Sequence, residues 1–463
     1  MIRFFHMHVP ISAVLLLAAD LALSFAAISL GFNLSYAPIS ELGDVVEVQL
    51  AEKVIFSGCI VFSLFLMGLH YRRYIADLRM TALRVAAGHA VAFILLSIVF
   101  YVAQDVSIWR SALLPAMAVT LIGTYLVRLA YVRVADIRMF KRGVLVLGAG
   151  AQAAAIDALE RSGLSGNFHC VGFVASDGEE TPLGARVLSA EGRSLLDLAQ
   201  DEGASEIVVA LKDRRSRLPI EELLSCRLQG IQVSHFATFM ERETGRVELE
   251  ALNPSWLIFA DGFSAALRLQ RLLKRGFDIV TSLLFLGFTL PVSALAVLAI
   301  VACDGGPIFY RQDRVGQHGK VFRLLKFRSM RVDAERDGVA RWAAQADSRI
   351  TPVGGFLRRT RIDEIPQIYN VLRGEMSFIG PRPERPTIVD QLRREIPFYD
   401  YRHAVKPGIT GWAQINYSYG ASLEDARQKL KLDLYYIKNY SLILDLLILM
   451  QTVRVVLWAQ GSR

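Results

Sequence analysis

The chain has 463 residues, of which 53% are hydrophobic and 21% charged, with a formal net charge of +8. This composition is too apolar for a disordered chain or a purely soluble protein, and the length predicts two to four folded units. Four cysteines, at positions 59, 170, 226 and 303, stand far apart with no CxxC pair and no metal-ligand spacing. We expect them to be buried free thiols.

Residues 1–140 predict an α-helical unit with four membrane spans. Each of four apolar runs approaches the ~20 residues that cross a bilayer as a helix. The runs occupy 11–31, 54–70, 85–103 and 109–131. Asp20 interrupts the first run, and an acid in that position is expected to face a neighbouring helix inside the bundle.

The charges of the loops predict the orientation of this unit. Segment 32–49 carries three acidic residues and no Lys or Arg, whereas segment 71–84 carries four Arg, and basic residues again follow the fourth run. Positive loops mark the cytoplasmic side of a bacterial membrane. Both ends of the four-helix unit are therefore expected in the cytoplasm, where the rest of the chain begins.

Residues 141–262 predict an α/β domain with a doubly wound, Rossmann-like parallel sheet. Short apolar segments predict strands at 144–147, 170–174 and 206–211. The turn Gly148-Ala149-Gly150 resembles the start of a dinucleotide fingerprint, but Ala153 occupies the third glycine position and no acid ends the second strand. We therefore expect a structural or nucleotide-sensing domain rather than one that uses NAD in catalysis.

Residues 263–463 predict a mainly α-helical domain that opens with a membrane helix at about 276–303. Pro291 lies near the middle of this apolar stretch, where it removes a helix hydrogen bond and predicts a kink. Basic residues flank the stretch, so we favour a re-entrant helix that enters the inner leaflet and returns over an ordinary fifth span. A final amphipathic stretch, 441–459, predicts a helix lying in the membrane interface.

Polar motifs follow the re-entrant stretch in a specific order. They are Arg311-Gln312, Arg314-Val315-Gly316, Lys326-Phe327-Arg328, Arg358 to Pro366 with the pair Asp363-Glu364, Gly380-Pro381-Arg382-Pro383, and Arg402-His403 with Lys406 to Asn416. Residues 274–463 resemble the bacterial sugar transferase family, the monotopic polyprenyl-phosphate phosphoglycosyltransferases, and the whole chain is similar to its long form. The run 416–422 resembles an exopolysaccharide subgroup associated with exosortase systems, with Tyr417-Ser418 in place of the usual Gly-Arg pair.

The residues themselves point to phosphate chemistry. Arginine suits phosphate because its planar fork makes paired, charge-assisted hydrogen bonds. The candidate substrate-binding residues are Arg311, Lys326, Arg358, Arg382 and Arg402. Asp363 and Glu364 would repel each other without a cation, and Mg²⁺ binds one or two carboxylates together with substrate phosphates. Both are therefore candidate metal ligands, placed just before a helix predicted at 366–372.

The resemblance implies a two-step transfer of a phosphosugar from a UDP-sugar to polyprenyl phosphate, with release of UMP. In this scheme Asp363 forms a covalent phosphosugar intermediate, and Glu364 helps to bind Mg²⁺ or to orient the acceptor. It also implies the initiating step of exopolysaccharide biosynthesis at the bacterial inner membrane, with the catalytic domain on the cytoplasmic face. The expected partners are membrane lipids, downstream glycosyltransferases and, by analogy, a second copy of the chain, but no nucleic acid.

Two other classes of function remain open from the sequence. One is a sugar-nucleotide oxidoreductase built on residues 141–262, which would need a full dinucleotide fingerprint and a catalytic Tyr-x-x-x-Lys. The other is a non-enzymatic membrane scaffold or nucleotide sensor for polysaccharide assembly. Release of UMP from UDP-sugars distinguishes the transferase from both.

Overall fold

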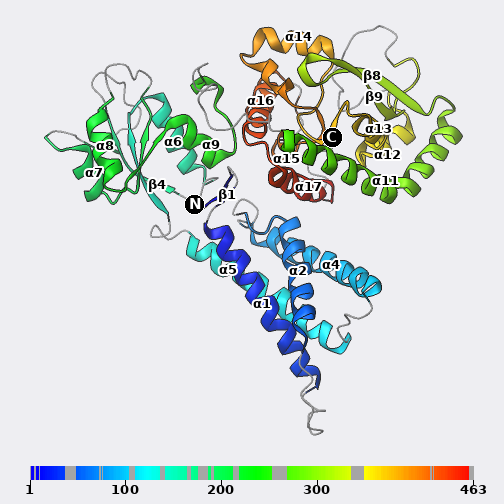
Figure 1. Ribbon diagram of the computed structural model, residues 1–463, viewed down its shortest axis with the longest axis horizontal. Coiled ribbons are helices and arrows are strands. Elements are labelled where there is room, and N and C mark those ends of the chain that lie inside the picture. Colours follow the sequence, from blue (N-terminus) through cyan, green and yellow to red (C-terminus); the bar gives the residue numbers. More distant parts are fainter. Residues whose placement is uncertain are drawn as a thin grey trace. The chain divides into compact units, whose positions relative to one another are not determined.

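A computed structural model gives the architecture of the chain (Figure 1). It describes residues 2–4, 7–9, 11–36, 48–71, 75, 77–103, 110–135, 141–163, 168–175, 186–188, 192–211, 218–252, 268–334, 349–417, 420 and 422–457. The chain packs as two compact units, residues 8–244 and residues 245–463, with the first seven residues divided between them. The units are described separately below.

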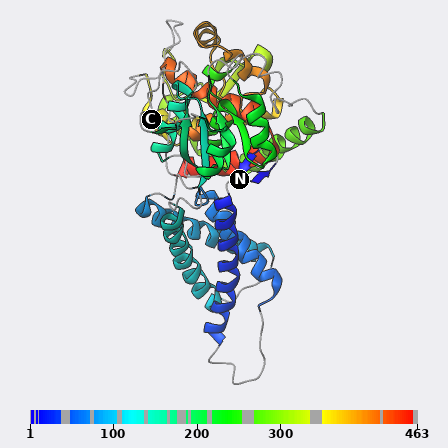
Figure 2. The same cartoon turned by 90° about the vertical axis from the view of Figure 1, so that its left-hand side faces the viewer.

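The four helices predicted in the N-terminal part are present (Figure 2). After the short strands β1 (Ile2–Phe4) and β2 (Met7–Val9) come α1 (Ile11–Tyr36), α2 (Leu50–Leu66), α4 (Leu78–Val102) and α5 (Arg110–Ala135). Helix α4 begins seven residues before its apolar run because the carboxylate of Asp77 caps it, accepting hydrogen bonds from the amides of Arg79 and Met80.

Length and hydropathy identify this protein as a membrane protein. Among the described residues, the helical segments long and apolar enough to cross a membrane are Ser12–Ser35, Leu78–Val102, Ser111–Arg133 and Leu269–Asp304. Helix α2 has 17 residues, or about 26 Å at 1.5 Å per residue, which is slightly shorter than a bilayer core of about 30 Å.

A buried ion pair joins two of these helices. The guanidinium of Arg128 on α5 donates through both terminal nitrogens to the carboxylate of Asp20 on α1, and neither side chain is exposed. His70, in the turn after α2, places Nε2 3.0 Å from Oδ2 of Asp20. The prediction that Asp20 faces the interior of the bundle is confirmed.

The α/β region contains a five-stranded parallel sheet with strand order β5-β4-β3-β6-β7. The strands are β3 (Arg142–Leu147), β4 (Phe168–Val174), β5 (Val187–Leu188), β6 (Glu206–Val209) and β7 (Gln232–His235), and the helices are α6 (Ala151–Arg161), α7 (Leu195–Asp201), α8 (Ile220–Leu228) and α9 (Phe236–Thr244). The three predicted strands are confirmed as β3, β4 and β6. The order reverses at β3, as in doubly wound folds.

The glycine turn after β3 has a structural reason. Gly148 has a φ of +124°, and a Cβ added to it would lie 2.8 Å from the carbonyl oxygen of Ala210. A glycine is therefore required by the packing of the two strand ends, independently of any nucleotide. The nucleotide-sensing role stays a prediction.

The cysteine prediction is only partly correct. Cys170 and Cys226 are buried, Cys59 is half-buried, and Cys303 is exposed. Cys303 lies near the end of an apolar helix whose outer face the second unit leaves uncovered, so an apolar run did not mean burial within the protein.

The second unit begins with a segment that packs into its core, Gly245–Leu252, which we call the strap. It includes the 3-10 turn η4 (Leu249–Ala251). Val247 and Leu249 are 2% and 8% exposed and belong to the main apolar core of this unit. Nζ of Lys431, on α16 (Leu423–Lys438), lies 2.6 Å from Glu248 and 3.2 Å from Glu250. The predicted domain boundary at 262/263 lies outside the described residues and stays a prediction.

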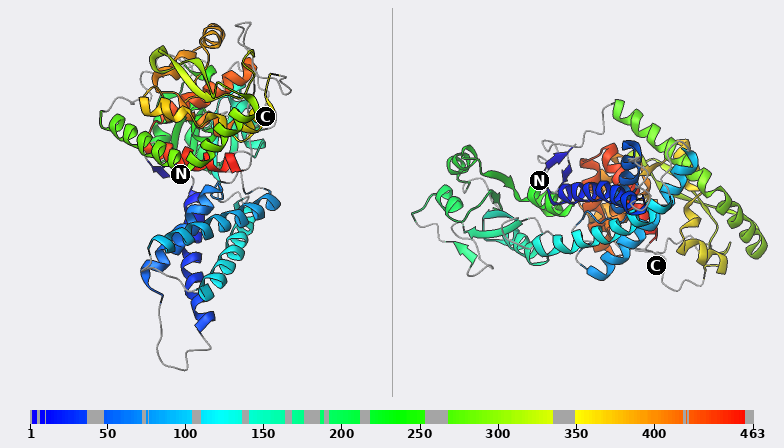
Figure 3. Two further views of the ribbon diagram at one scale, coloured as in Figure 1. Left: turned by 90° about the vertical axis from the view of Figure 1, so that its right-hand side faces the viewer. Right: turned by 90° about the horizontal axis from the view of Figure 1, so that it is seen from below.

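Helix α11 (Arg268–Asp304), which contains Pro291, runs along this unit as one helix (Figure 3). The kink at Pro291 stays a prediction. Near its start, Arg275 donates to the carbonyl oxygens of Val371 and Leu372. At its end, the carboxylate of Asp304 accepts a hydrogen bond from Thr351 at 2.7 Å. Large apolar side chains between these anchors, such as Phe288 at 84%, are exposed.

The remainder of the unit is mainly helical, as predicted. Its elements are β8 (Phe309–Val315), η5 (Gln317–Gly319), β9 (Val321–Phe327), α12 (Pro352–Arg359), η6 (Ile362–Glu364), α13 (Gln367–Arg373), β10 (Ser377–Ile379), α14 (Pro386–Glu395), η7 (Tyr399–Ala404), β11 (Gly408–Thr410), α15 (Trp412–Asn416) and α17 (Leu442–Leu457). Strands β8 and β9 form an antiparallel ribbon, and β10 pairs with β11 in parallel. On α17, Asp445 and Gln451 are buried within the unit, and the exposed side chains include Leu446 and Val453.

Candidate active site

The two carboxylates of the Asp-Glu pair lie on a short turn between two helices. Helix α12 ends at Arg359, and Arg361, with a left-handed φ of 56°, turns the chain into η6. Asp363 and Glu364 on this turn are 7% and 9% exposed. Pro366 caps the start of α13, which confirms the predicted helix start beside the pair.

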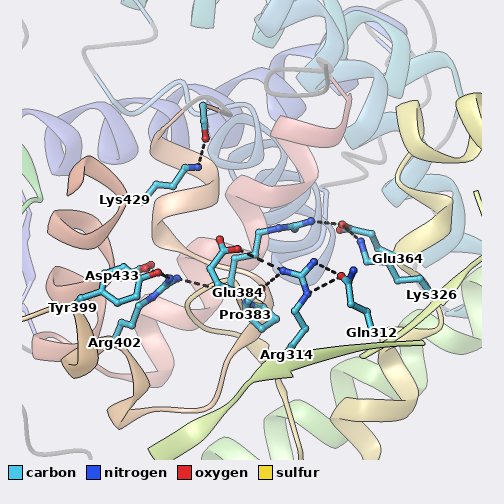
Figure 4. Close-up of polar contacts among 12 residues, drawn as sticks. Gln312, Arg314, Lys326, Glu364, Pro383, Glu384, Tyr399, Arg402, Lys429 and Asp433 are labelled. Atoms are coloured by element: carbon cyan, nitrogen blue, oxygen red, sulfur yellow. Dashed lines mark hydrogen bonds and ion pairs between the residues drawn. The ribbon is translucent and has the colours of Figure 1, made fainter. Parts of the chain in front are cut away.

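Cations from two other parts of the unit, a strand and a loop, converge on Glu364. Lys326, near the end of β9, places Nζ 3.0 Å from Oε1 of Glu364 and 3.7 Å from Oδ2 of Asp363. Arg382 donates to the same Oε1 at 2.6 Å, and Figure 4 shows Lys326 beside Glu364. Arg361 lies 3.8 Å from the other oxygen, Oε2. The structure therefore brings together the carboxylate pair and two of the predicted cationic residues, Lys326 and Arg382.

These contacts give the two carboxylates opposite pKa shifts. Burial raises the pKa of Asp363 above its usual value, and the negative charge of Glu364 adds to that effect while Lys326 opposes it. Burial also acts to raise the pKa of Glu364, but Arg382 and Lys326 more than offset it and hold that pKa well below its usual value. Glu364 is the fixed anion of the pair, and Asp363 is the more basic carboxylate.

The loop that carries Arg382 depends on a close approach between two backbone segments. Gly380 directly follows β10, and its amide donates to the carbonyl oxygen of Thr410 at 2.9 Å. A Cβ added to Gly380 would lie 2.3 Å from the carbonyl oxygen of Lys406. Only glycine fits at this crossing, which directs the following Pro381-Arg382-Pro383 segment towards the carboxylate pair.

The other predicted substrate-binding residues occupy different positions. Arg358, on α12, is close enough to Asp363 to lower the pKa of its carboxyl group. Arg311 is exposed and pairs with Leu325, so it lies on the opposite face of the ribbon from Lys326. Arg402 is buried and donates to Tyr399 and to the carbonyl oxygen of Arg382. Substrate contact by each of these residues stays a prediction.

Sequence reasoning gave no role to Arg314 or Asp433. Arg314 shares the ribbon face of Lys326, because it lies four residues along β8 from Tyr310, the cross-strand partner of Lys326. Asp433 is buried on α16 beside Arg402. The sequence did contain an indication that Asp433 is buried. It lies three residues after Leu430 and four before Ile437, and this spacing places it on the apolar face of a helix.

The carboxylate pair fits a magnesium ion that is bound together with substrate. Among the described residues, no three His, Cys, Asp or Glu side chains converge as a ready metal site. Mg²⁺ does not need one, because it is commonly held by one or two carboxylates plus substrate phosphates and water. Asp363 and Glu364 are the residues that would hold it.

A membrane protein in which cations converge on a buried carboxylate pair belongs to a class suited to reactions at the phosphate groups of nucleotides or lipids. The chain belongs to the bacterial sugar transferase family. The profile of that family, Bacterial sugar transferase, matches residues 269–459. The chain is also 32% identical over 355 residues, 70% of each chain, to a UDP-galactose-lipid carrier transferase of Erwinia amylovora.

Two further relatives match over a smaller share of the chain. A UDP-N-acetylgalactosamine-undecaprenyl-phosphate N-acetylgalactosaminephosphotransferase of Aeromonas hydrophila is 44% identical over 52% of this chain and 56% of its own length. A UDP-glucose:undecaprenyl-phosphate glucose-1-phosphate transferase of Escherichia coli strain K12 is 47% identical over 40% of each chain. The chain thus spans about half or less of the length of these two relatives.

Proposed function

We propose that this protein transfers a phosphosugar from a UDP-sugar to polyprenyl phosphate, forming a polyprenyl-diphosphate sugar and releasing UMP. The observation that carries the proposal is the buried Asp363-Glu364 pair, with Glu364 held by Arg382 and Lys326. The relatives support the substrate class, because their names specify UDP-sugars or undecaprenyl phosphate.

In this proposal Asp363 is the nucleophile, and the transfer takes place in two steps. An oxygen of Asp363 bonds to the β-phosphorus, and the bond from that phosphorus to the oxygen shared with the α-phosphate breaks, so the electron pair leaves with UMP. An oxygen of polyprenyl phosphate then bonds to the same phosphorus, and the oxygen of Asp363 leaves with its electron pair. This assignment is supported by the contrast in pKa, because the more basic carboxylate is the better nucleophile.

The cations serve the charge that the phosphoryl group carries. Arg382 and Lys326 lie within reach of the carboxylate pair, so a phosphoryl group at Asp363 would meet both. Mg²⁺, held by Asp363 and Glu364, would supply further neutralisation of phosphate charge. Glu364 keeps Lys326 and Arg382 in place through its single shared oxygen.

We propose further that α11 is re-entrant and that the catalytic unit lies on the cytoplasmic face of the inner membrane. Polar anchors near both ends of the helix, at Arg275 and Asp304, support this, because they bond to the same compact unit. Those residues are about 44 Å apart along a straight helix, more than a bilayer core of about 30 Å. If α11 spanned the bilayer, Arg275 or Asp304 would lie within the lipid or on its far side, although both residues bond to the same compact unit.

The proposed reaction would begin the assembly of an exopolysaccharide on its lipid carrier. Glycosyltransferases acting on the polyprenyl-diphosphate sugar would follow it, and the enzyme would work as a homodimer among inner-membrane lipids. The relative named as the uncharacterized sugar transferase EpsL, 41% identical over 90% of its own length, gives no substrate name. The identity of the transferred sugar is therefore left to the activity test described next.

The direct test measures UMP release by the full-length protein in detergent, over a panel of UDP-glucose, UDP-galactose and N-acetylated UDP-hexosamines. With undecaprenyl phosphate, one or more of these sugars should give continuous UMP release. Without lipid, a burst of about one UMP per active chain is expected. No UMP from any sugar would refute the transferase, and UMP release that strictly requires lipid would refute the covalent intermediate.

A further inference from the structure

The segment carrying Arg382 has little regular support of its own. Residues 380–385 form neither helix nor strand. Pro381 and Pro383 have no amide hydrogen, so neither can hold the segment by donating a hydrogen bond. The carbonyl oxygens of the segment remain as points of attachment, and two of them accept hydrogen bonds from arginines on separate elements, the buried Arg402 and the half-buried Arg314.

The first of these arginines is Arg402 on η7. It donates to the carbonyl oxygen of Arg382 at 2.9 Å. Its guanidinium also lies 3.0 Å from Oδ2 of Asp433 and donates to the hydroxyl oxygen of Tyr399 at 2.5 Å. An anion and a phenol therefore both hold the guanidinium of Arg402 that reaches Arg382, and Figure 4 shows Asp433 and Tyr399 beside it.

The second arginine is Arg314 on β8. It donates to the carbonyl oxygen of Pro383 at 2.9 Å, and Gln312 accepts from it at 2.6 Å. The amide of Val315, the next residue on the strand, donates to the carbonyl oxygen of Glu384 at 2.9 Å. Three consecutive carbonyl oxygens, at positions 382, 383 and 384, are thus held from two sides.

We infer that Arg314 and Arg402 form a clamp on the backbone at residues 382–383 that positions the Arg382 side chain against Glu364. In the clamp they are positioning residues, because their hydrogen bonds reach the reacting groups through Arg382. The backbone held by the clamp is directly bonded to the side chain that donates to Glu364 at 2.6 Å. The role of the clamp in catalysis rests on the proposed function. The existence of the clamp does not.

The kinetic test uses a double-mutant cycle on the full-length protein. Arg402→Lys keeps the charge but loses the planar fork, so kcat should fall about tenfold or more while KM changes much less. Arg382→Ala removes the positioned side chain. If Arg402 acts through Arg382, adding Arg402→Lys to Arg382→Ala should cause little further loss. If the kcat loss of the double variant instead equals the product of the two single-variant losses, Arg402 does not act through Arg382.

The variant Tyr399→Phe removes one hydrogen bond to Arg402 and keeps the aromatic ring. Its kcat should fall by less than that of Arg402→Lys, and a wild-type kcat in Tyr399→Phe would contradict the clamp.

A structural readout judges the clamp without any activity. Hydrogen–deuterium exchange should be faster in Arg402→Lys than in wild type for peptides that contain Val315 and residues 382–385. Arg393→Lys is the matched control. Arg393 on α14 makes an ion pair at 2.7 Å with Asp400 on η7, the same element that carries Arg402, but it takes no part in the clamp. It should alter neither exchange in these peptides nor kcat. Unchanged exchange in Arg402→Lys overturns the clamp, whereas absence of UMP release by wild type overturns only the proposed function.

Discussion

Asp363 and Glu364 are neighbours in sequence, yet their surroundings give them different capabilities. Glu364 is held by two cations, whereas the cation contact of Asp363 is the longer one, 3.7 Å from Lys326. Asp363→Asn keeps the shape and removes the nucleophilic oxygen anion. Turnover should fall by about 10³-fold or more. Mass spectrometry after incubation with UDP-sugar alone should locate the phosphosugar on the peptide containing Asp363 and find none in the variant; an adduct in the variant would exclude Asp363 as the nucleophile.

Glu364→Gln should produce a different defect. The amide cannot offset the charges of Arg382 and Lys326, so both cations lose their fixed anion. We expect a rate loss of about 10²-fold, a higher magnesium requirement and continued formation of the adduct on Asp363. A titration of UMP release against Mg²⁺ measures the requirement. Complete loss of the adduct in Glu364→Gln would assign the first step to Glu364 as well.

Asp433 predicts a pH dependence. Burial and the nearby Glu384 raise its pKa to about 6, while Arg402 and Lys429 act in the opposite direction. Asp433 is therefore ionised and paired with Arg402 above about pH 6, and it takes up a proton as the pH falls through that value. The wild-type rate should exceed that of Asp433→Asn at pH 7.5, and the ratio of the two rates should approach one below pH 6. A ratio independent of pH between 5 and 8 would show that the charge of Asp433 has no part in catalysis.

At the scale of elements, the strap Gly245–Leu252 belongs to the catalytic unit. Burial of Val247 and Leu249 is worth roughly 3–6 kcal/mol in total at about 1.5–3 kcal/mol per large apolar side chain. A fragment of residues 245–463 should therefore be more stable in detergent than one of residues 253–463, with a higher midpoint of thermal unfolding and a higher yield of active protein. Equal midpoints for the two fragments would show that the strap contributes nothing to the fold.

The limits of sequence reasoning are visible in the ribbon β8–β9. Periodicity and turn residues predicted the strands of the α/β region, the helix after Pro366 and the mainly helical character of the last domain. The order of the motifs also brought Lys326, Arg382 and the Asp-Glu pair into one site. Arg311 and Arg314 both alternate with polar neighbours, however, so only the pairing register shows that Arg314 shares the face of Lys326.

The packing of the strap and the burial of polar residues on α17 escaped prediction for a related reason, although the α17 helix itself was predicted. A segment with two buried apolar residues has too short a pattern to indicate a partner such as Lys431, 183 positions further along the chain than Glu248. The acid and amide on α17 indicated contact with water, but Asp445 lies 2.8 Å from Lys274 and is buried within the unit. Polar residues on an apolar helix indicate water or a buried partner equally well, and only the tertiary structure distinguishes them.

At the scale of the whole molecule, the proposed topology places both soluble regions on one side of the membrane. Ser225→Cys on α8 and Arg394→Cys on α14 introduce thiols at exposed positions in a background that lacks the four native cysteines. A membrane-impermeant maleimide should label neither thiol in intact cells and both after the inner membrane is permeabilised. Labelling of Arg394→Cys alone in intact cells would mean that α11 crosses the bilayer.

The pair of Asp20 and Arg128 also constrains how the protein is made. The two residues lie on α1 and α5, 108 positions apart in the chain. A single charge at the centre of a membrane helix costs about 2.5–3.5 kcal/mol when the helix inserts alone. During synthesis α1 emerges long before α5, so its aspartate has no arginine to meet while the intervening helices are being translated. The cost of the buried aspartate is therefore offset by Arg128 only after the ribosome has delivered α5, so the first helix of the bundle gains its ion pair from the last one.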